Sequence, residues 1–368
     1  VAGKVRMWEG WDFLGPVVDD EGRCRGATAQ NLVTMEIRAF PADALVIATG
    51  STPLLPGGWH GAMTLRTAED AALLREQLQP DTHLACVGAG WLGSEVASVA
   101  ASAGVRVTVL EAGSSPLEAS LGPSLGPYFA RWFDAAGVEL RAGTPVSGTG
   151  PGRVYLAEGL VLDADVVLVA IGVKPATVWL ADTGLLDASA TAAAALHPLP
   201  VRGGAHLFVD FDQRVLGTSA PVYAVGDVTV RRSLRHGWIL GGHWDNALRS
   251  PEIAARTILG LPIPANLVDP APYVFSTQFG HSLGLLGSPN HNDDVVLRGN
   301  PEHSSWSALW FSPGTSQLTG ILLVDRPRDI GTARRMFAGP QLPTVDRAIA
   351  GDPNQPLTPP AITGEIAR

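Results

Sequence analysis

"HLACVGAGWLGSEVASVAASAGVRVTVLEAG", residues 83–113, decides the fold of this chain. An apolar strand is expected over 84–87, a helix of small residues over 91–103, and a second strand over 105–110 that ends at Glu111. Between the first strand and the helix stand three glycines with the spacing G-x-G-x-x-G, namely Gly88, Gly90 and Gly93. The spacing is a weak signal alone, but this strand–turn–helix–strand setting predicts a dinucleotide-binding unit.

Each residue of this unit has a physical task. Gly88 allows the tight turn, Gly90 lets the backbone approach a pyrophosphate, and Gly93 lets helix and strand pack closely. The start of the helix offers N–H groups and a positive dipole to the phosphates. Glu111 can accept hydrogen bonds from both adenosine ribose hydroxyls, and its charge would repel a 2′-phosphate. Ala112 offers no cation to offset that charge, so the sequence predicts NADH rather than NADPH.

Composition excludes several classes of protein. The chain has 368 residues, 46% of them hydrophobic and 17% charged, which indicates two or three globular domains. The net charge of −9 argues against nucleic-acid binding. Cys24 and Cys86 form no CxxC pair, and the nine histidines show no HxxxH spacing, so neither a redox dithiol nor a metal site is expected. No apolar run reaches membrane-spanning length and no signal peptide is recognised, so we expect a cytoplasmic protein that does not enter membranes.

Three more strand ends carry small residues that let a backbone run close to a ligand. Ala48, Thr49 and Gly50 follow the strand ALVI, and Gly172 follows VVLVAI. Gly226 and Asp227 follow the strand PVYAV, where the carboxylate can bind a ribityl hydroxyl of a flavin. Repeated strand returns of this kind predict two nucleotide-binding domains.

Glu95 stands just past the glycine loop, early in the expected helix. Two interpretations are open for it. It is either a solvated acid that stabilises the helix dipole, or a group near the reacting rings of the cofactors.

The order of these motifs resembles the two-dinucleotide-binding flavoprotein reductases of the pyridine nucleotide-disulfide oxidoreductase superfamily. The finer similarity is to ferredoxin reductases of the putidaredoxin and rubredoxin reductase type, and it covers about residues 45–368. It rests on these stretches: LRTAEDA (65–71), VGAGWLGSEVA (87–97), VAIGVKPAT (169–177), YAVGDVT (223–229), HWDNALRS (243–250), YVFSTQFGHSLGLLG (273–287), VVLRGNP (295–301) and LLVDRPRDIGTARRM (322–336).

The resemblance implies that NADH reduces FAD by hydride transfer and that FAD passes single electrons to a [2Fe–2S] ferredoxin or a rubredoxin. It further implies that Arg66, Asp227 and Trp244 contact FAD. Gly90, Gly93, Glu111 and Gly172 would line the NADH site, with Glu95 beside the nicotinamide. The family usually has an acidic residue where Thr277 stands here.

The expected fold is α/β, with a Rossmann-like NAD-binding domain inserted in a partial FAD-binding domain and a C-terminal α+β reductase domain after them. We expect the partial FAD-binding domain at 1–80, the NADH-binding domain at 81–180, the return to the FAD-binding domain at 181–265, the reductase domain at 266–350 and a tail at 351–368. The alanine-rich residues 187–197 fit either a helix or a flexible insertion.

The first 44 residues fit this family less well. GRCRGATAQNLVTMEIRAFPADA (22–44) resembles the flavoprotein subunit of succinate dehydrogenase or fumarate reductase, which suggests a junction near 44–50. A divergent reductase is the alternative. The first flavin-binding βαβ unit is not recognised, so the sequence predicts weak or absent FAD binding and a truncated, impaired enzyme.

Two other functions and one docking surface follow from the same residues. The chain could be a non-catalytic NADH-binding relative of apoptosis-inducing factor, whereas a succinate or fumarate oxidoreductase would need a capping domain that is not recognised.

A ferredoxin, typically acidic, would dock on basic residues, and the oligomeric state is open between monomer and homodimer. The candidate docking residues are Arg231, Arg232, Arg235, Arg326, Arg328, Arg334 and Arg335.

Overall fold

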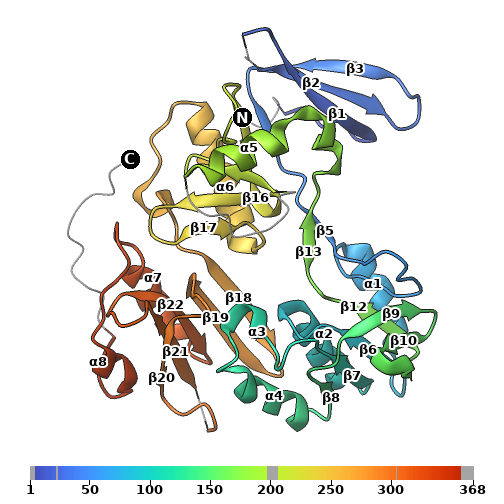
Figure 1. The fold of residues 1–368 in the computed structure, drawn as a ribbon, viewed down its shortest axis with the longest axis vertical. Coiled ribbons are helices and arrows are strands. Elements are labelled where there is room, and N and C mark those ends of the chain that lie inside the picture. Colours follow the sequence, from blue (N-terminus) through green and yellow to red (C-terminus); the bar gives the residue numbers. More distant parts are fainter. Residues whose placement is uncertain (1–4, 22–23, 197–205, 304, 358–368) are drawn as a thin grey trace. The chain divides into compact units, whose positions relative to one another are not determined.

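The computed structural model of the protein describes residues 5–21, 24–196, 206–303 and 305–357. The chain forms two compact units, each made of two segments (Figure 1). Unit 1 comprises Val1–Ser51 and Pro175–Pro270, and unit 2 comprises Thr52–Lys174 and Ala271–Arg368.

Unit 2 contains a four-stranded parallel sheet with the order β12-β6-β7-β8. Side chains alternate across it: Leu84 and Cys86 pack on one face with helix α2, whereas Ala85 and Val87 pack on the other with β10. Both faces are covered, which accounts for the unbroken apolar strands. The elements of this part are β6 (His83–Val87), β7 (Arg106–Leu110), β8 (Glu139–Arg141), β12 (Val166–Val169), α1 (Ala68–Gln77), α2 (Trp91–Ser102), α3 (Glu118–Leu121), α4 (Gly126–Ala135), β9 (Val146–Gly150), β10 (Arg153–Leu156), η1 (Ala157–Gly159) and β11 (Val161–Asp163).

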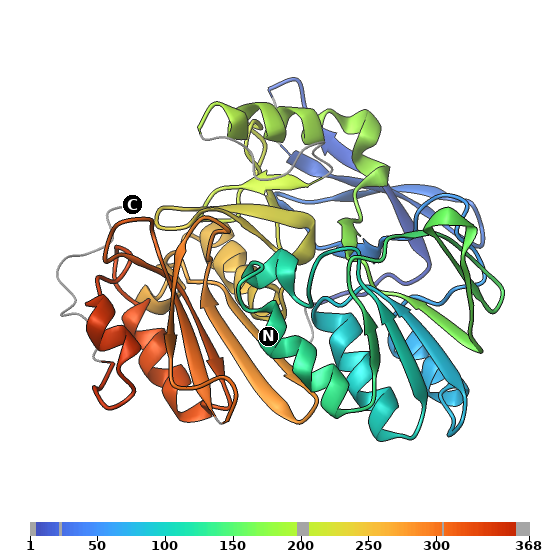
Figure 2. The ribbon, with the colours of Figure 1, turned by 60° about the horizontal axis from the view of Figure 1, so that its bottom comes forward.

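The C-terminal segment of unit 2 is an antiparallel sheet with the order β18-β19-β22-β21-β20. Leu309 and Phe311 face α7 and α8, which lie on one side of the sheet (Figure 2). Trp306 and Trp310 face the other side, where α3 and α4 supply Leu121 and Phe129. The elements are β18 (Tyr273–Gln278), β19 (His281–Gly287), β20 (Asp294–Arg298), β21 (Trp306–Phe311), β22 (Leu318–Val324), η5 (Pro327–Asp329), α7 (Ile330–Met336) and α8 (Arg347–Gly351).

Unit 1 is built from small sheets whose buried side chains form three clusters. The short strands β4 and β15 pair in parallel, β14 pairs with β16 and β16 with β17, and β1, β2 and β3 form an antiparallel sheet. Its elements are β1 (Trp11–Val18), β2 (Cys24–Asn31), β3 (Ile37–Pro41), β4 (Leu45–Ile47), η2 (Val178–Thr183), α5 (Leu185–Ala194), β14 (Leu207–Val209), β15 (Val222–Ala224), η3 (Gly226–Val228), β16 (Thr229–Ser233), β17 (Gly237–Leu240), α6 (Trp244–Ile258) and η4 (Ala265–Leu267). The strands β5 (Ser51–Pro53) and β13 (Val173–Pro175) pair with each other.

The mixed α/β fold agrees with the sequence-based expectation. The alanine-rich stretch is a helix as far as Ala194, because Ala193 is buried against Phe208 of β14. Unit 2 contains both the expected NADH-binding domain and the expected reductase domain. It also contains α1, whose buried Leu74 packs in the same cluster as residues of α2. Of the expected tail at 351–368, residues 358–368 lie outside the described part.

Candidate functional site

The glycine loop of unit 2 has the geometry that its spacing predicts. Gly88 has φ +104°, and a Cβ there would lie 2.6 Å from the carbonyl oxygen of Ala170. A Cβ on Gly93 would lie 2.0 Å from the carbonyl oxygen of Gly88, so helix and turn can approach only without it. A Cβ on Gly90 would meet nothing within 4 Å. Gly90 therefore borders open space at the start of α2, where no acidic side chain occupies the first turn.

Glu111 lies at the end of β7 and closes the other side of this loop. Its Oε2 accepts a 2.6 Å hydrogen bond from the backbone N–H of Ala89, and its Oε1 accepts a 2.7 Å bond from that of Gly113. The carboxylate is thus held within the glycine loop rather than pointing away from it. Gly172, beyond the end of β12, has φ +116° and open space where a Cβ would stand. These residues fit a dinucleotide lying across the carboxyl ends of the parallel strands.

Glu95 projects from α2 toward the C-terminal sheet. Its Oε1 accepts a hydrogen bond of 2.5 Å from the hydroxyl of Ser276 on β18. The Ser276 hydroxyl in turn accepts from Nε2 of Gln278 at 2.9 Å. Glu95 is therefore not simply a solvated acid on a helix surface.

The thiol of Cys86 lies beneath the glycine loop, 3.8 Å from the carbonyl oxygens of Gly88 and Gly93. Burial, with the charge of Glu111 adding to it, raises the pKa of this thiol to about 12. Both cysteines of the chain are free and buried. The cysteine side chains therefore pack as small apolar groups.

Unit 1 brings together a second set of predicted residues. The paired strands β4 and β15 end side by side, at Ala48, Thr49 and Gly50 on one strand and at Gly226 and Asp227 on the other. Gly50 and Gly226 have φ of +70° and +72°.

Two hydroxyls order these turns. The Ser51 hydroxyl donates to Oδ2 of Asp227 at 2.8 Å, and the Thr49 hydroxyl donates to the carbonyl oxygen of Ala176 at 2.9 Å. A half-buried carboxylate held beside two glycine turns fits a polyhydroxyl group of a flavin nucleotide.

Arg66 and Trp244 were also predicted to contact the flavin. Trp244 is the first residue of α6, and its side chain is 65% exposed. Arg66 belongs to unit 2, where its backbone N–H donates to Oδ2 of Asp70 beside the start of α1. Their flavin contacts stay predictions.

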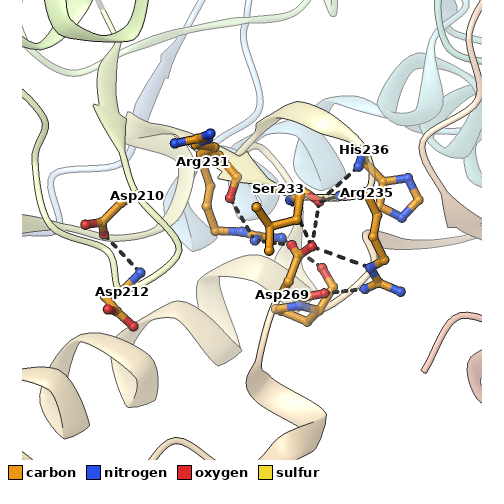
Figure 3. Close-up of polar contacts among 10 residues, drawn as sticks. Asp210, Asp212, Arg231, Ser233, Arg235, His236 and Asp269 are labelled. Atoms are coloured by element: carbon orange, nitrogen blue, oxygen red, sulfur yellow. Dashed lines mark hydrogen bonds and ion pairs between the residues drawn. The ribbon is translucent and has the colours of Figure 1, made fainter. Parts of the chain in front are cut away.

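The expected basic docking cluster of unit 1 is wrong for two of its three arginines. Arg231 and Arg235 have side chains only 4% and 3% exposed, and both bind the buried carboxylate of Asp269 (Figure 3). Arg231 Nη1 donates to Asp269 Oδ1 at 2.8 Å, and Ser233 donates to Oδ2 at 2.9 Å. Two guanidinium groups are thus used to bind one carboxylate, because buried charges need partners.

In the C-terminal segment, Arg328, Arg334 and Arg335 are exposed. Arg326 is partly buried and pairs with Asp329 at 2.6 Å. Three of the four docking candidates in this segment are therefore on exposed surface.

Neither a metal-binding cluster nor a membrane-spanning helix is found in the described part of the chain. No group of three or more histidine, cysteine, aspartate or glutamate side chains is arranged there to hold a metal ion. Nor does any helix among those residues combine the length and apolar character that crossing a membrane requires.

Three side chains that position predicted residues were not recognised from the sequence, nor was Ser98, which holds the turn after β18. Ser51 donates to Asp227, Ser276 donates to Glu95, and Gln278 donates to Ser276. Ser98 accepts a hydrogen bond from the backbone N–H of Phe279. Strand alternation was the available signal for Ser276 and Gln278, because it places two polar residues on one face of β18.

Comparison with known families matches nearly the whole chain. The family described as pyridine nucleotide-disulphide oxidoreductase matches residues 17–250, and the one described as reductase C-terminal matches residues 273–360. The first match includes residues 17–44, where the sequence also resembled a different flavoprotein.

Solved structures of similar chains agree with these matches. The crystal structure of Fdr9 is 36% identical with a TM-score of 0.77, and the alignment covers 95% of this chain and 82% of that one. The ferredoxin reductase for the CYP199A2 system from Rhodopseudomonas palustris is 25% identical with a TM-score of 0.72, covering 92% and 78%. The putidaredoxin reductase–putidaredoxin complex, 24% identical with a TM-score of 0.73, covers 89% and 75% and shares the fold.

Proposed function

Because the chain belongs to the pyridine nucleotide-disulphide oxidoreductase family, we propose that it takes electrons from NADH and passes them through FAD to a [2Fe–2S] ferredoxin or a rubredoxin. Membership makes it an FAD- and NAD(P)H-dependent oxidoreductase. The choice of NADH, the iron–sulfur acceptor and a cytoplasmic location, where NADH is available, are the proposal. The observation that carries it is the Glu111 carboxylate, held by the amides of Ala89 and Gly113 beside the glycine loop.

The residues of unit 2 would bind and orient the dinucleotide. The pyrophosphate would lie over Gly88, Gly90 and Gly93 and face the start of α2, whose N–H groups and dipole favour an anion. Glu111 would accept from the adenosine ribose hydroxyls and disfavour a 2′-phosphate. The nicotinamide half would extend toward Gly172 and Glu95.

The residues of unit 1 would bind the flavin. Ser51 holds the Asp227 carboxylate, which would accept hydrogen bonds from the ribityl chain, and Gly50 and Gly226 would let the backbone approach. Ala48, Thr49 and Trp244 of the same unit would add further contacts, and the flavin contact of Arg66, in unit 2, stays a prediction. When bound, FAD supplies two-electron chemistry toward NADH and one-electron chemistry toward an iron–sulfur protein.

The acceptor is inferred from the second domain. The reductase C-terminal match covers β18 to α8, and the ferredoxin reductase of Rhodopseudomonas palustris shares the fold across both domains. Both buried cysteines are free, which fits a reductase that works without a dithiol relay.

Because the sequence predicts weak FAD binding and an impaired enzyme, the test uses the purified chain with FAD in excess. We expect NADH to bleach the flavin absorbance under anaerobic conditions and to support reduction of a [2Fe–2S] ferredoxin. Asp227→Ala should weaken FAD binding about tenfold or more, whereas Asp182→Ala, an exposed site in the same unit, should leave it unchanged. A chain that binds both nucleotides without bleaching would contradict the proposal.

A further inference from the structure

A short polar chain joins α2 to the C-terminal sheet of unit 2. Ser276 donates to Glu95 Oε1 at 2.5 Å, and Gln278 Nε2 donates to the Ser276 hydroxyl at 2.9 Å. Ser276 is 4% exposed and Gln278 is fully buried. Glu95 is the only acidic residue of α2. The family and the proposed function give neither Ser276 nor Gln278 a role.

The chemistry of these groups fixes the direction of both hydrogen bonds. An ionised carboxylate only accepts, so the single hydroxyl proton of Ser276 must point to Glu95. The lone pairs of that oxygen then require a donor, which is the amide N–H of Gln278. The Gln278 Oε1 is buried and has no hydrogen-bond partner within the described residues. Its amide is therefore committed to Ser276 at the cost of an unsatisfied acceptor.

A separate contact already fixes β18 to α2. The backbone N–H of Phe279 donates to the Ser98 hydroxyl at 2.7 Å, and the Phe279 ring packs on Phe133 with a centroid distance of 4.6 Å. Since the strand is held in this way one helical turn further along, the Ser276 bond is not needed to dock it. Its consequence is instead a fixed position for the Glu95 carboxylate.

We propose that Ser276, supported by Gln278, is a positioning residue that aims Glu95 at the nicotinamide half of the dinucleotide. This rests on the proposed function. The adenosine ribose would lie at Glu111, beyond the end of β7. In the sheet order β12-β6-β7-β8, the nicotinamide half of the ligand would then extend across the end of β6 toward β12. A fixed carboxylate there would accept from the carboxamide N–H₂ of the nicotinamide, and the C-terminal segment would thus complete a site built mainly by the glycine-loop segment.

The decisive experiment compares NADH with ADP-ribose, which lacks the nicotinamide, in direct binding titrations of the full chain by calorimetry. We expect Ser276→Ala to weaken NADH binding about 5- to 30-fold, as for loss of a hydrogen bond to a charged group. Its affinity for ADP-ribose should stay within about twofold. Ser276→Thr, which keeps the hydroxyl, should restore NADH binding. Ser98→Ala removes the neighbouring contact and should change neither affinity.

A double-mutant cycle separates positioning from general damage. In a Glu95→Ala background, Ser276→Ala should have no further effect on NADH binding. Equal losses for NADH and ADP-ribose, or a loss that persists without Glu95, would overturn the inference, as would unchanged NADH binding by Ser276→Ala. If the wild-type chain bound neither ligand, the proposed function would fail together with it. Melting temperatures measured alongside show whether each variant is folded.

Discussion

At the scale of single residues, two glycines of one loop face opposite surroundings. A Cβ on Gly93 would clash with the backbone oxygen of Gly88, whereas a Cβ on Gly90 would enter open space at a φ of −74°. A substitution at Gly93 therefore tests folding of the loop, whereas a substitution at Gly90 tests access of the ligand to it.

Gly90→Ala should fold, with a loss of stability of about 1 kcal/mol or less because glycine is the better N-cap residue, and should bind NADH at least about tenfold more weakly. Gly93→Ala should lose both stability and binding. Thermal melts and NADH titrations measure the two effects. Normal NADH binding by Gly90→Ala would show that the pyrophosphate does not lie at this turn.

Glu111 is the second residue whose role a substitution can isolate. Glu118 offers a matched control, because its carboxylate lies close to that of Glu111. A Cβ on Gly113 would lie 3.2 Å from Glu111 Oε1 and 3.1 Å from Glu118 Oε2. Glu118 accepts from the amide and hydroxyl of Ser114 and from the amide of Ser115, so it orders the loop that follows β7.

Glu111→Gln should lower the ratio of kcat/KM for NADH over NADPH at least about tenfold, because the charge that repels a 2′-phosphate is removed. Glu118→Gln removes the same charge nearby and should change the ratio less than about threefold. Equal effects of the two variants would assign the preference to the general negative potential of the loop.

At the scale of elements, the hairpin of β16 and β17 is fixed by buried charge. Arg231 and Arg235 bind Asp269, and His236 lies beside them in the turn between the strands. Burial lowers the pKa of His236 to about 3, with the positive charges of Arg235 and Arg231 adding to the effect and Asp269 opposing it.

This hairpin predicts an acid-sensitive stability. Unfolded His236 binds a proton below about pH 6.5, whereas the folded form stays neutral to about pH 3. The contribution of neutral His236 to the free energy of unfolding is therefore complete above pH 6.5. It is lost as the pH falls, by up to about 1.4 kcal/mol per pH unit. In urea melts between pH 7 and pH 4.5, His236→Gln should lose stability less steeply than the wild type. Parallel pH profiles would contradict this.

At the scale of the whole molecule, the proposed function requires a chain of net charge −9 to attract an acidic partner. Because Arg231 and Arg235 are buried in ion pairs, the remaining candidates on exposed surface are Arg328, Arg334 and Arg335 of the C-terminal segment. Arg334 also stacks over the ring of Tyr273 at 4.7 Å. Electrostatic steering through these groups should act on the association rate.

Raising the salt concentration from 50 to 500 mM should slow ferredoxin reduction about tenfold and leave reduction of a neutral quinone unchanged. Arg328→Gln and Arg334→Gln together should flatten this salt dependence. Arg75→Gln, on exposed α1, is the matched control and should keep it. A rate of ferredoxin reduction that does not vary with salt would rule out steering.

Elements with local sequence signals could be predicted without the structure. The glycine spacing, the apolar strands before it and Glu111 after it predicted β6, α2 and β7 within one or two residues, because turn geometry and side-chain periodicity act over short separations. The capping box at the start of α1, in which Thr67 and Asp70 bind each other's backbone, is local as well.

Which of these residues contact one another depends on the tertiary structure. Glu95 and Ser276 are 181 positions apart and meet because β18 packs against α2. Arg231 looked like a surface cation until folding brought it to Asp269, 38 positions away. Such pairs depend on the packing of distant segments, and the free energy that decides burial of a charge comes from its final partners rather than from its sequence neighbours.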